Sequence, residues 1–182
     1  MAGPESTTLR ADDPSRLLPW LKGRSPIFAR MDDRVARGLF ALSTLRIEPR
    51  GATLIKQGER ADALYIVIEG TLVTRVAYNK MARDLFSHSP GEVAGLLGMF
   101  DQEPSPYEVY AVAQTQVVAV DLRKLWMYAA AYHPMAMAIH AAFTPALTAH
   151  LVEMDLRAGK MAQRKNASVA GTGEGFLRGE RR

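Results

Sequence analysis

The segment from Gly51 to Gly70 limits the possible folds of this 182-residue chain more than any other part of it. Two short apolar stretches, 53–56 and 64–68, lie between turn sequences that contain Gly58 and end at Gly70. A glycine suits a turn that needs a positive φ or a close approach of two backbones. Short strands separated by turns at intervals of about eight to twelve residues are typical of a β sandwich or barrel. We expect further strands at 71–76, 84–87, 109–113 and 116–120.

The segments on either side of these strands have helical periodicity. Apolar residues recur at steps of three or four positions in 27–45 and again in 122–156. His133-Pro134 should end a helix, because the residue before a proline is disfavoured in the α region. Pro145 should kink or divide the helix that follows. We therefore expect one or two short N-terminal helices and a C-terminal helix pair.

The two ends of the chain have the composition of unstructured segments. Residues 1–24 are polar and contain three prolines, which predicts a flexible N-terminal arm with at most a short turn near 17–21. Residues 159–182 combine several glycines with many charges, which predicts a disordered basic tail. A single domain is expected between them, at residues 25–158.

Composition excludes several classes of function. Without cysteine, the chain has no disulfide, no thiolate metal site and no thiol nucleophile. The net charge of +4 comes largely from the C-terminal tail, which indicates solvated charge rather than a nucleic-acid surface. No catalytic residues and no metal site are expected, since the histidines lack the spacing of metal ligands. The four histidines are His88, His133, His140 and His150.

No membrane span and no export signal are expected. The chain has no uninterrupted run of about 18 apolar residues. Its N-terminus lacks the apolar core of a signal peptide. The expected location is therefore the cytoplasm.

Four motifs of the chain lie at 26–31, 51–70, 90–92 and 118–134. In their order and spacing they resemble the motifs of the cyclic-nucleotide-binding-domain superfamily, which includes catabolite activators and the regulatory subunits of protein kinase A. The resemblance covers about residues 25–158. It implies a mainly β fold with flanking helices: a β-roll, or double-stranded jelly roll, at 46–121, a helical segment at 25–45 before it and a helix pair at 122–158 after it.

In that superfamily, a cassette after the third motif holds the cyclic phosphate. A short helix points its N–H groups at the phosphate, an arginine neutralises it and a glutamate accepts from the ribose 2′-hydroxyl. The resemblance places Leu96 at the glutamate position and Ser105 at the arginine position, and no Arg or Lys lies between Arg83 and Arg123. The candidate ligand contacts in this degenerate cassette are Gly91, Glu92, Gly95, Leu96, Leu97, Ser105 and Tyr107.

The two replacements should abolish useful affinity for a cyclic nucleotide. A hydrogen bond to a charged group contributes about 1.5–3 kcal/mol, so two losses amount to roughly 3–6 kcal/mol, or about two to four decades of affinity. We therefore expect no cofactor, and binding of cyclic AMP or cyclic GMP in the usual way is disfavoured. An uncharged or apolar ligand would suit Leu96 better than a phosphate.

A second, local resemblance covers residues 90–111. This stretch is similar to the cassette in the regulatory domains of patatin-like phospholipases of the neuropathy-target-esterase type, which also depart from the usual Glu/Arg pair. The catalytic signature of those esterases, Gly-x-Ser-x-Gly, is absent from the chain. The resemblance implies either a detached regulatory domain or an independent protein with a similarly altered cassette.

These observations leave three hypotheses about function. The first is a non-enzymatic regulatory or sensor module that has lost or altered its nucleotide binding. The second is a structural subunit that packs into a larger assembly through the roll and the C-terminal helices, and the third is a regulatory fragment of a phospholipase. DNA binding is not expected, because about 25 residues follow Leu156 and these are too few for a DNA-reading domain. The apolar helices within 122–156 predict a protein partner or a second copy of the chain.

Overall fold

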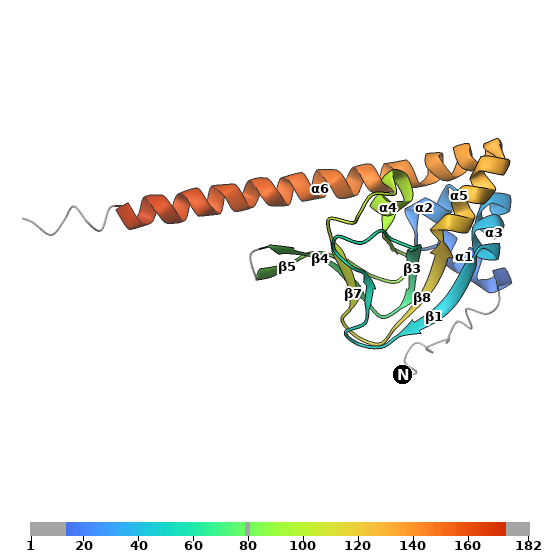
Figure 1. The fold of residues 1–182 in the computed structure, drawn as a ribbon, viewed down its shortest axis with the longest axis horizontal. Coiled ribbons are helices and arrows are strands. Elements are labelled where there is room, and N and C mark those ends of the chain that lie inside the picture. The colour runs from blue at the N-terminus through green and yellow to red at the C-terminus, as the bar shows by residue number, and fades with distance from the viewer. Residues whose placement is uncertain (1–13, 79–80, 174–182) are drawn as a thin grey trace, which may run out of the picture. The chain divides into compact units, whose positions relative to one another are not determined.

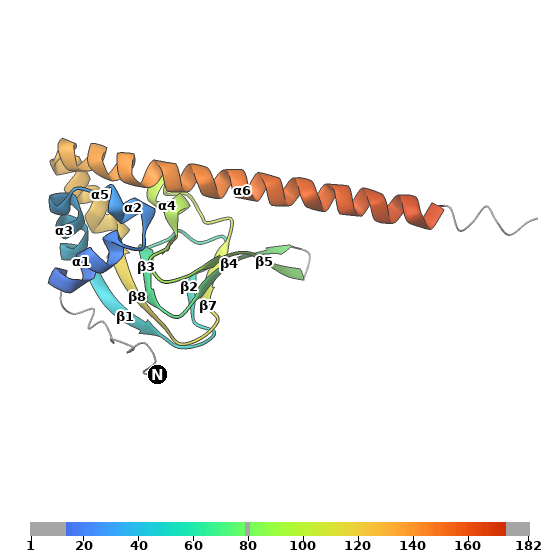
Figure 2. The ribbon, with the colours of Figure 1, turned by 180° about the vertical axis from the view of Figure 1, so that it is seen from behind.

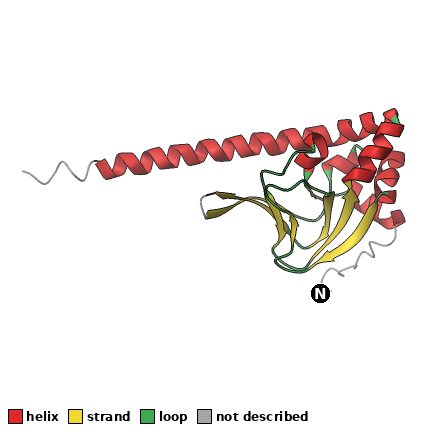
Figure 3. Cartoon of the chain, in the orientation of Figure 1, coloured by secondary structure: helices red, strands yellow, loops and turns green. Residues whose placement is uncertain are grey.

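The computed structural model describes residues 14–78 and 81–173, and its strands form two antiparallel sheets (Figures 1 and 3). The first sheet has the strand order β1-β8-β3-β6 and the second has the order β2-β7-β4-β5. Consecutive strands repeatedly change sheets, which confirms the expected β-roll. The strands are β1 Ser43–Glu48, β2 Thr53–Ile55, β3 Ala63–Glu69, β4 Leu72–Tyr78, β5 Met81–His88, β6 Val93–Ala94, β7 Glu108–Ala111 and β8 Thr115–Asp121.

Apolar side chains between the two sheets form the core of the roll. Tyr65 and Val67 of β3 belong to the same buried cluster as Leu72 of β4 and Val109 of β7. Side chains alternate across a strand, so the neighbouring positions of β3 face the other side of the first sheet. These positions are buried as well, which explains the uninterrupted apolar run at 64–68.

Three N-terminal helices, α1 Pro14–Lys22, α2 Pro26–Ala29 and α3 Asp33–Ala41, lie beside the first sheet (Figures 1 and 2). Phe28 of α2 is completely buried; its ring stacks on Phe40 at 6.0 Å and meets the edge of Phe143 at 6.4 Å. The start of α3 is capped by Asp32, whose carboxylate accepts from the Arg34 amide at 2.8 Å. The helical segment is shorter than expected, because β1 begins at Ser43.

The predicted flexible arm is wrong for its second half. Residues 14–22 form helix α1, and Leu17, Leu18 and Leu21 on this helix are buried. Three buried leucines on one short helix favour ordering through the hydrophobic effect, which outweighs the effect of Pro14 and Pro19 on the local chain. Residues 1–13 lie outside the described part of the chain.

Two C-terminal helices follow β8, namely α5 Leu122–Ala131 and α6 His133–Gly173. The break between them falls at Tyr132, as His133-Pro134 predicts. Of the two outcomes predicted at Pro145, division of the helix is wrong, because α6 continues through this residue. A proline removes one backbone hydrogen bond, and a long helix with good helix-forming residues on both sides can tolerate that loss.

The predicted C-terminal tail is also helical in part. The backbone of α6 is helical as far as Gly173, and residues 174–182 lie outside the described part of the chain. All six residues of 160–165 are alanine, methionine, glutamine, lysine or arginine, which have high helix propensity. The chain divides into two compact units, Met1–Thr144 and Pro145–Arg182, and every residue of the sites described below belongs to the first.

One part of α6, His133–Glu153, is long and apolar enough to cross a membrane, with a mean hydropathy of 1.4. The sequence analysis expected no such span, because it looked for an uninterrupted apolar run. The segment meets the criterion for a membrane span through its length and its mean hydropathy alone, although histidines, threonines and a proline interrupt the apolar residues.

Candidate functional site

The turn that opens the cassette is built into the roll by backbone hydrogen bonds. The Gly91 amide donates to the Val67 carbonyl at 2.9 Å, and the Val67 amide donates to the Glu92 carbonyl at 3.0 Å. Gly91 has a φ of 94°, and a Cβ on it would lie 2.9 Å from the Cβ of Arg24. The carboxylate of Glu92 accepts from the Ser89 amide at 2.6 Å. Gly91 and Glu92 therefore shape the turn.

The short cassette helix α4, Leu96–Asp101, begins at a glycine that cannot easily be replaced. Gly95 has a φ of 87°, and a Cβ on it would lie 2.9 Å from Cδ1 of Ile55 and 3.2 Å from the carbonyl oxygen of Ala63. Leu96, at the position of the family's glutamate, is 4% exposed, and Leu97 is half-buried. The helix thus presents a buried apolar side chain at the position to which the sequence resemblance assigns the family's carboxylate.

Ser105, which the sequence resemblance assigns to the position of the family's arginine, uses all of its polar groups within the protein. Its amide donates to the Glu59 carbonyl at 2.8 Å, and its carbonyl accepts from the Gly58 amide at 2.7 Å. Its hydroxyl donates to the Tyr107 carbonyl at 2.8 Å and accepts from the Tyr107 amide at 3.3 Å. The predicted cassette residues are therefore spread over the turn at Gly91, helix α4 and the segment around Ser105, and the polar groups of Ser105 are occupied by Gly58, Glu59 and Tyr107.

The inner face of the second sheet carries buried residues that the sequence analysis did not select. Thr74 pairs with Phe86 and Val109, and His88 pairs with Leu72, so these side chains share the face of the core cluster. The Thr74 hydroxyl and Nε2 of His88 lie 2.8 Å apart, and both residues are buried. The alternation of Phe86 and His88 along β5 is the signal that could have identified them.

The half-buried Tyr107 is the last of the predicted cassette residues, and burial raises the pKa of its phenol.

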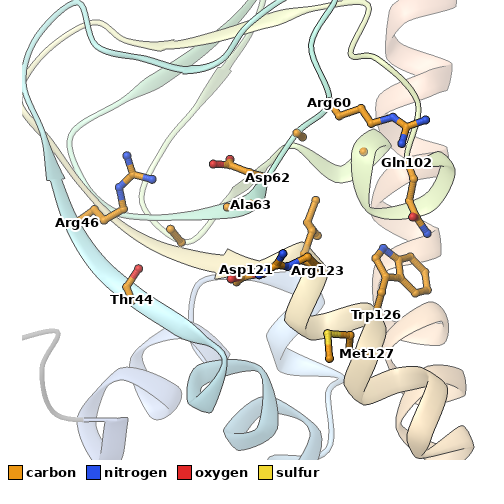
Figure 4. Close-up of a pocket in the computed structure, with 14 residues that line it drawn as sticks. Thr44, Arg46, Arg60, Asp62, Ala63, Gln102, Asp121, Arg123, Trp126 and Met127 are labelled. Carbon is orange, nitrogen blue, oxygen red and sulfur yellow. The ribbon is translucent and has the colours of Figure 1, made fainter.

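A separate pocket of about 710 Å³ opens beside the cassette, and none of the seven predicted contacts lines it (Figure 4). It lies between α4, the first turns of α5 and the ends of β1, β3 and β8. Its lining residues are Thr44, Arg46, Arg60, Ala61, Asp62, Ala63, Gly98, Gln102, Ala119, Asp121, Leu122, Arg123, Trp126 and Met127.

Most charged groups of this pocket already have partners. Arg46 forms an ion pair with Glu48 at 2.7 Å. The Asp121 carboxylate accepts from the Lys124 amide at 2.9 Å. This hydrogen bond lowers the pKa of the Asp121 carboxyl; partial burial opposes the shift, and the positive charge of Lys124 adds to it. Asp62 accepts from the Tyr65 hydroxyl at 3.2 Å. The pocket was not predicted from the sequence, although Thr44 and Arg46 alternate along β1, close to the predicted start of the roll.

Metal binding has no support within the described residues. No group of three or more His, Asp or Glu side chains in that part of the chain could hold a metal ion. The four histidines are spread over β5 and α6.

Comparisons with known proteins agree with the fold. Residues 46–132 match the family model described as the cyclic nucleotide-binding domain. The Catabolite Activator Protein of Thermus thermophilus has 22% sequence identity and a TM-score of 0.59, over 74% of this chain and 63% of that chain. This chain therefore spans less than two thirds of the length of the Thermus protein.

Two further solved structures are regulatory domains of similar size. The N-terminal domain of a transcriptional regulator from Streptomyces coelicolor A3(2) has 26% identity and a TM-score of 0.59, over 74% of this chain and 94% of that chain. The sensor domain of the transcriptional regulator DNR from Pseudomonas aeruginosa has 21% identity and a TM-score of 0.58, over 76% of this chain and 93% of that chain. These similarities confirm a β-roll with flanking helices.

Proposed function

We propose that this chain, whose residues 46–132 form a domain of the cyclic nucleotide-binding family, is a non-enzymatic regulatory or sensor module that does not bind cyclic AMP or cyclic GMP in the usual way. The observation that carries the proposal is the state of Ser105. Its hydroxyl is bonded to the Tyr107 backbone, at the position where the family has a phosphate-binding arginine. The similarity to a sensor domain and to an N-terminal regulator domain supports the regulatory role.

The electrostatics of the cassette support the same conclusion. A phosphate that leaves water needs charged or N–H donors in compensation. The cassette supplies no cation, because no Arg or Lys lies between Arg83 and Arg123. Leu96 offers a buried apolar surface and no acceptor for a ribose hydroxyl. A cyclic nucleotide would therefore lose hydration without gaining the contacts that normally offset the loss.

Titration calorimetry with cyclic AMP and cyclic GMP tests this proposal. We expect no saturable heat below about 1 mM, since the missing contacts amount to about two to four decades of affinity. The circular dichroism spectrum and thermal midpoint of the same sample serve as the control for folding. Submicromolar binding of either nucleotide would contradict the proposal.

The surface through which such a module contacts another protein is best placed on α5 and α6. Met127, Tyr132 and Met137 are 68%, 47% and 70% exposed. Met127 lies on α5, Met137 on α6 and Tyr132 between the two helices, and exposed large apolar side chains favour contact with a protein. We therefore propose a protein partner or a second copy of this chain at the surface that these three residues mark, and a cytoplasmic location.

The alternative is a structural subunit of a larger assembly, and a third reading is the regulatory piece of a patatin-like phospholipase. The subunit hypothesis is favoured by the burial of Phe86 and His88 inside the roll, since these side chains take up space there. It predicts association through α5 and α6 whether or not a ligand is present, whereas the sensor hypothesis predicts association that changes with a ligand.

Light scattering of matched variants tests the placement of this surface. If a second copy is the partner, Met137→Glu should shift a dimer toward monomer, because it places a charge in the contact. Met81→Glu is the control, because Met81 is 74% exposed and belongs to β5, outside the three residues that mark the proposed surface. A dimer that Met81→Glu dissociates and Met137→Glu does not would contradict the placement.

A further inference from the structure

The pocket between α4, α5 and the ends of β1, β3 and β8 has the size of a small-molecule site. Its volume of about 710 Å³ falls within the range of roughly 300–1,000 Å³ that is usual for ligand pockets. Its apolar lining includes Ala61, Ala63 and Ala119, which are small and leave room for a ligand. The helix α4 packs closely on one wall, because a Cβ on Gly98 would lie 2.8 Å from the Cβ of Ala61.

An unsatisfied donor lies in this pocket. The indole N–H of Trp126 is buried and has no hydrogen-bond partner among the described residues. A buried indole N–H normally finds an acceptor, and leaving a buried donor unpaired costs free energy. Trp126 lines the pocket, so an acceptor atom of a bound molecule can supply the missing partner.

The pocket also offers positive charge that no described carboxylate neutralises by direct contact. Arg60 and Arg123 line it, and neither forms a side-chain hydrogen bond or an ion pair with a described residue. The pocket carboxylates of Asp62 and Asp121 accept from Tyr65 and Lys124 instead. Figure 4 shows Arg60, Gln102 and Trp126 along one side of the pocket, so N–H donors line that side.

We propose that this pocket binds a small organic anion, whose carboxylate or phosphate oxygens accept from Arg60, Gln102 and Trp126. Guanidinium and amide N–H groups are the donors that carboxylate and phosphate oxygens prefer. The apolar part of the anion lies against the alanines and Met127. The inference deepens the proposed sensor function and rests on it, since it supplies the ligand that the cassette does not take.

Ring contacts connect this pocket to two helices. The Trp126 ring lies 5.8 Å from the His140 ring of α6, and His140 lies 5.4 Å from the Phe100 ring of α4. A ligand that bonds to the Trp126 indole therefore touches a side chain in contact with the first turns of α6. Binding can thereby bias the helix on which the proposed surface for protein contact lies.

Tryptophan fluorescence of a Trp20→Phe variant tests the proposal, because Trp126 is then the sole tryptophan of the chain. The probes are phenyl phosphate and benzoate, with phenol as the uncharged control and inorganic phosphate as the control for charge alone. We expect a saturable change with at least one organic anion, at a Kd of about 1 mM or tighter, and none with phenol. The two anions distinguish a phosphate site from a carboxylate site.

Matched substitutions then assign the binding to this pocket. Arg60→Gln should weaken the anion by about tenfold, whereas Arg50→Gln, an exposed arginine outside the pocket, should leave the Kd unchanged. Trp126→Phe, followed by calorimetry, removes the indole donor and should weaken binding by about threefold to tenfold.

Two results would overturn the proposal. One is the lack of a saturable change with both organic anions up to about 10 mM. The other is an equal Kd for Arg60→Gln and Arg50→Gln, which would show association elsewhere on the protein. Both results concern the anion titrations alone. The proposed function is tested separately, by the cyclic-nucleotide titration and by light scattering of the variants on α6 and β5.

Discussion

Residues 91–107 of the cassette and the pocket beside them differ in how their polar groups are used. In the cassette, the Ser105 hydroxyl is bonded to the Tyr107 backbone and the Glu92 carboxylate to the Ser89 amide. In the pocket, the Trp126 indole N–H has no partner in the described residues, and Arg60 forms no ion pair there. A site can bind a polar ligand only where the fold leaves hydrogen-bond donors or acceptors without a partner. Among the described residues of this chain, such groups lie in the pocket and not at the position where related domains bind the nucleotide.

The largest effect is expected from Leu96→Glu, which introduces a carboxylate at the position that the resemblance assigns to the family's glutamate. Leu96→Glu would bury a charge, because Leu96 is 4% exposed, and the segment between Arg83 and Arg123 has no Arg or Lys to pair with it. We expect a loss of about 3–5 kcal/mol in the free energy of unfolding at neutral pH. The loss should shrink on acidification, because burial raises the pKa of a carboxyl and protonation removes its charge. Urea denaturation at several pH values measures both effects.

Leu97→Glu is the matched control for this substitution. Leu97 is half-buried on the same short helix, so its replacement should cost clearly less. A stable Leu96→Glu protein that gains cyclic AMP binding would break the comparison, since it would show that the cassette keeps space for the nucleotide.

A smaller effect is expected from Gly95→Ala at the start of α4. The added Cβ would meet Ile55 and the Ala63 carbonyl, and its φ of 87° is unfavourable for alanine, so we expect a loss of about 2–3 kcal/mol. Gly51→Ala separates the two causes, because Gly51 has a similar φ of 85° but nothing within 4 Å of an added Cβ. It should cost only about 1 kcal/mol from backbone strain. Equal losses for the two variants in urea denaturation would show that the close packing around Gly95 contributes nothing.

The sequence predicted the scaffold of the roll better than the site. The turns at Gly58 and Gly70 and the apolar run in β3 are local signals, and the structure has both glycines at positive φ. The β-roll was expected to begin at residue 46, whereas β1 begins at Ser43, and β6 was missed because it has only two residues. Such strands depend on pairing with β8 and β3, which no local pattern encodes.

The site was predicted only in part, because the cassette positions come from the resemblance and the pocket depends on tertiary contacts. The seven cassette residues were identified, and their roles as ligand contacts stay predictions. Arg60 and Trp126 are distant in sequence, and they line the same pocket only because α5 follows β8 beside β3. The buried pair of Thr74 and His88 likewise required the register of β4 and β5.

Hydrogen–deuterium exchange with each ligand in turn tests the comparison between cassette and pocket most directly. The cassette amides of residues 95–107 should exchange at the same rate with and without cyclic AMP at about 1 mM, a concentration that would saturate a site of ordinary affinity. Phenyl phosphate or benzoate should instead slow exchange at residues 60–62 and 121–127, which flank the pocket. Protection of residues 95–107 by cyclic AMP, with no protection around the pocket by either anion, would contradict the account.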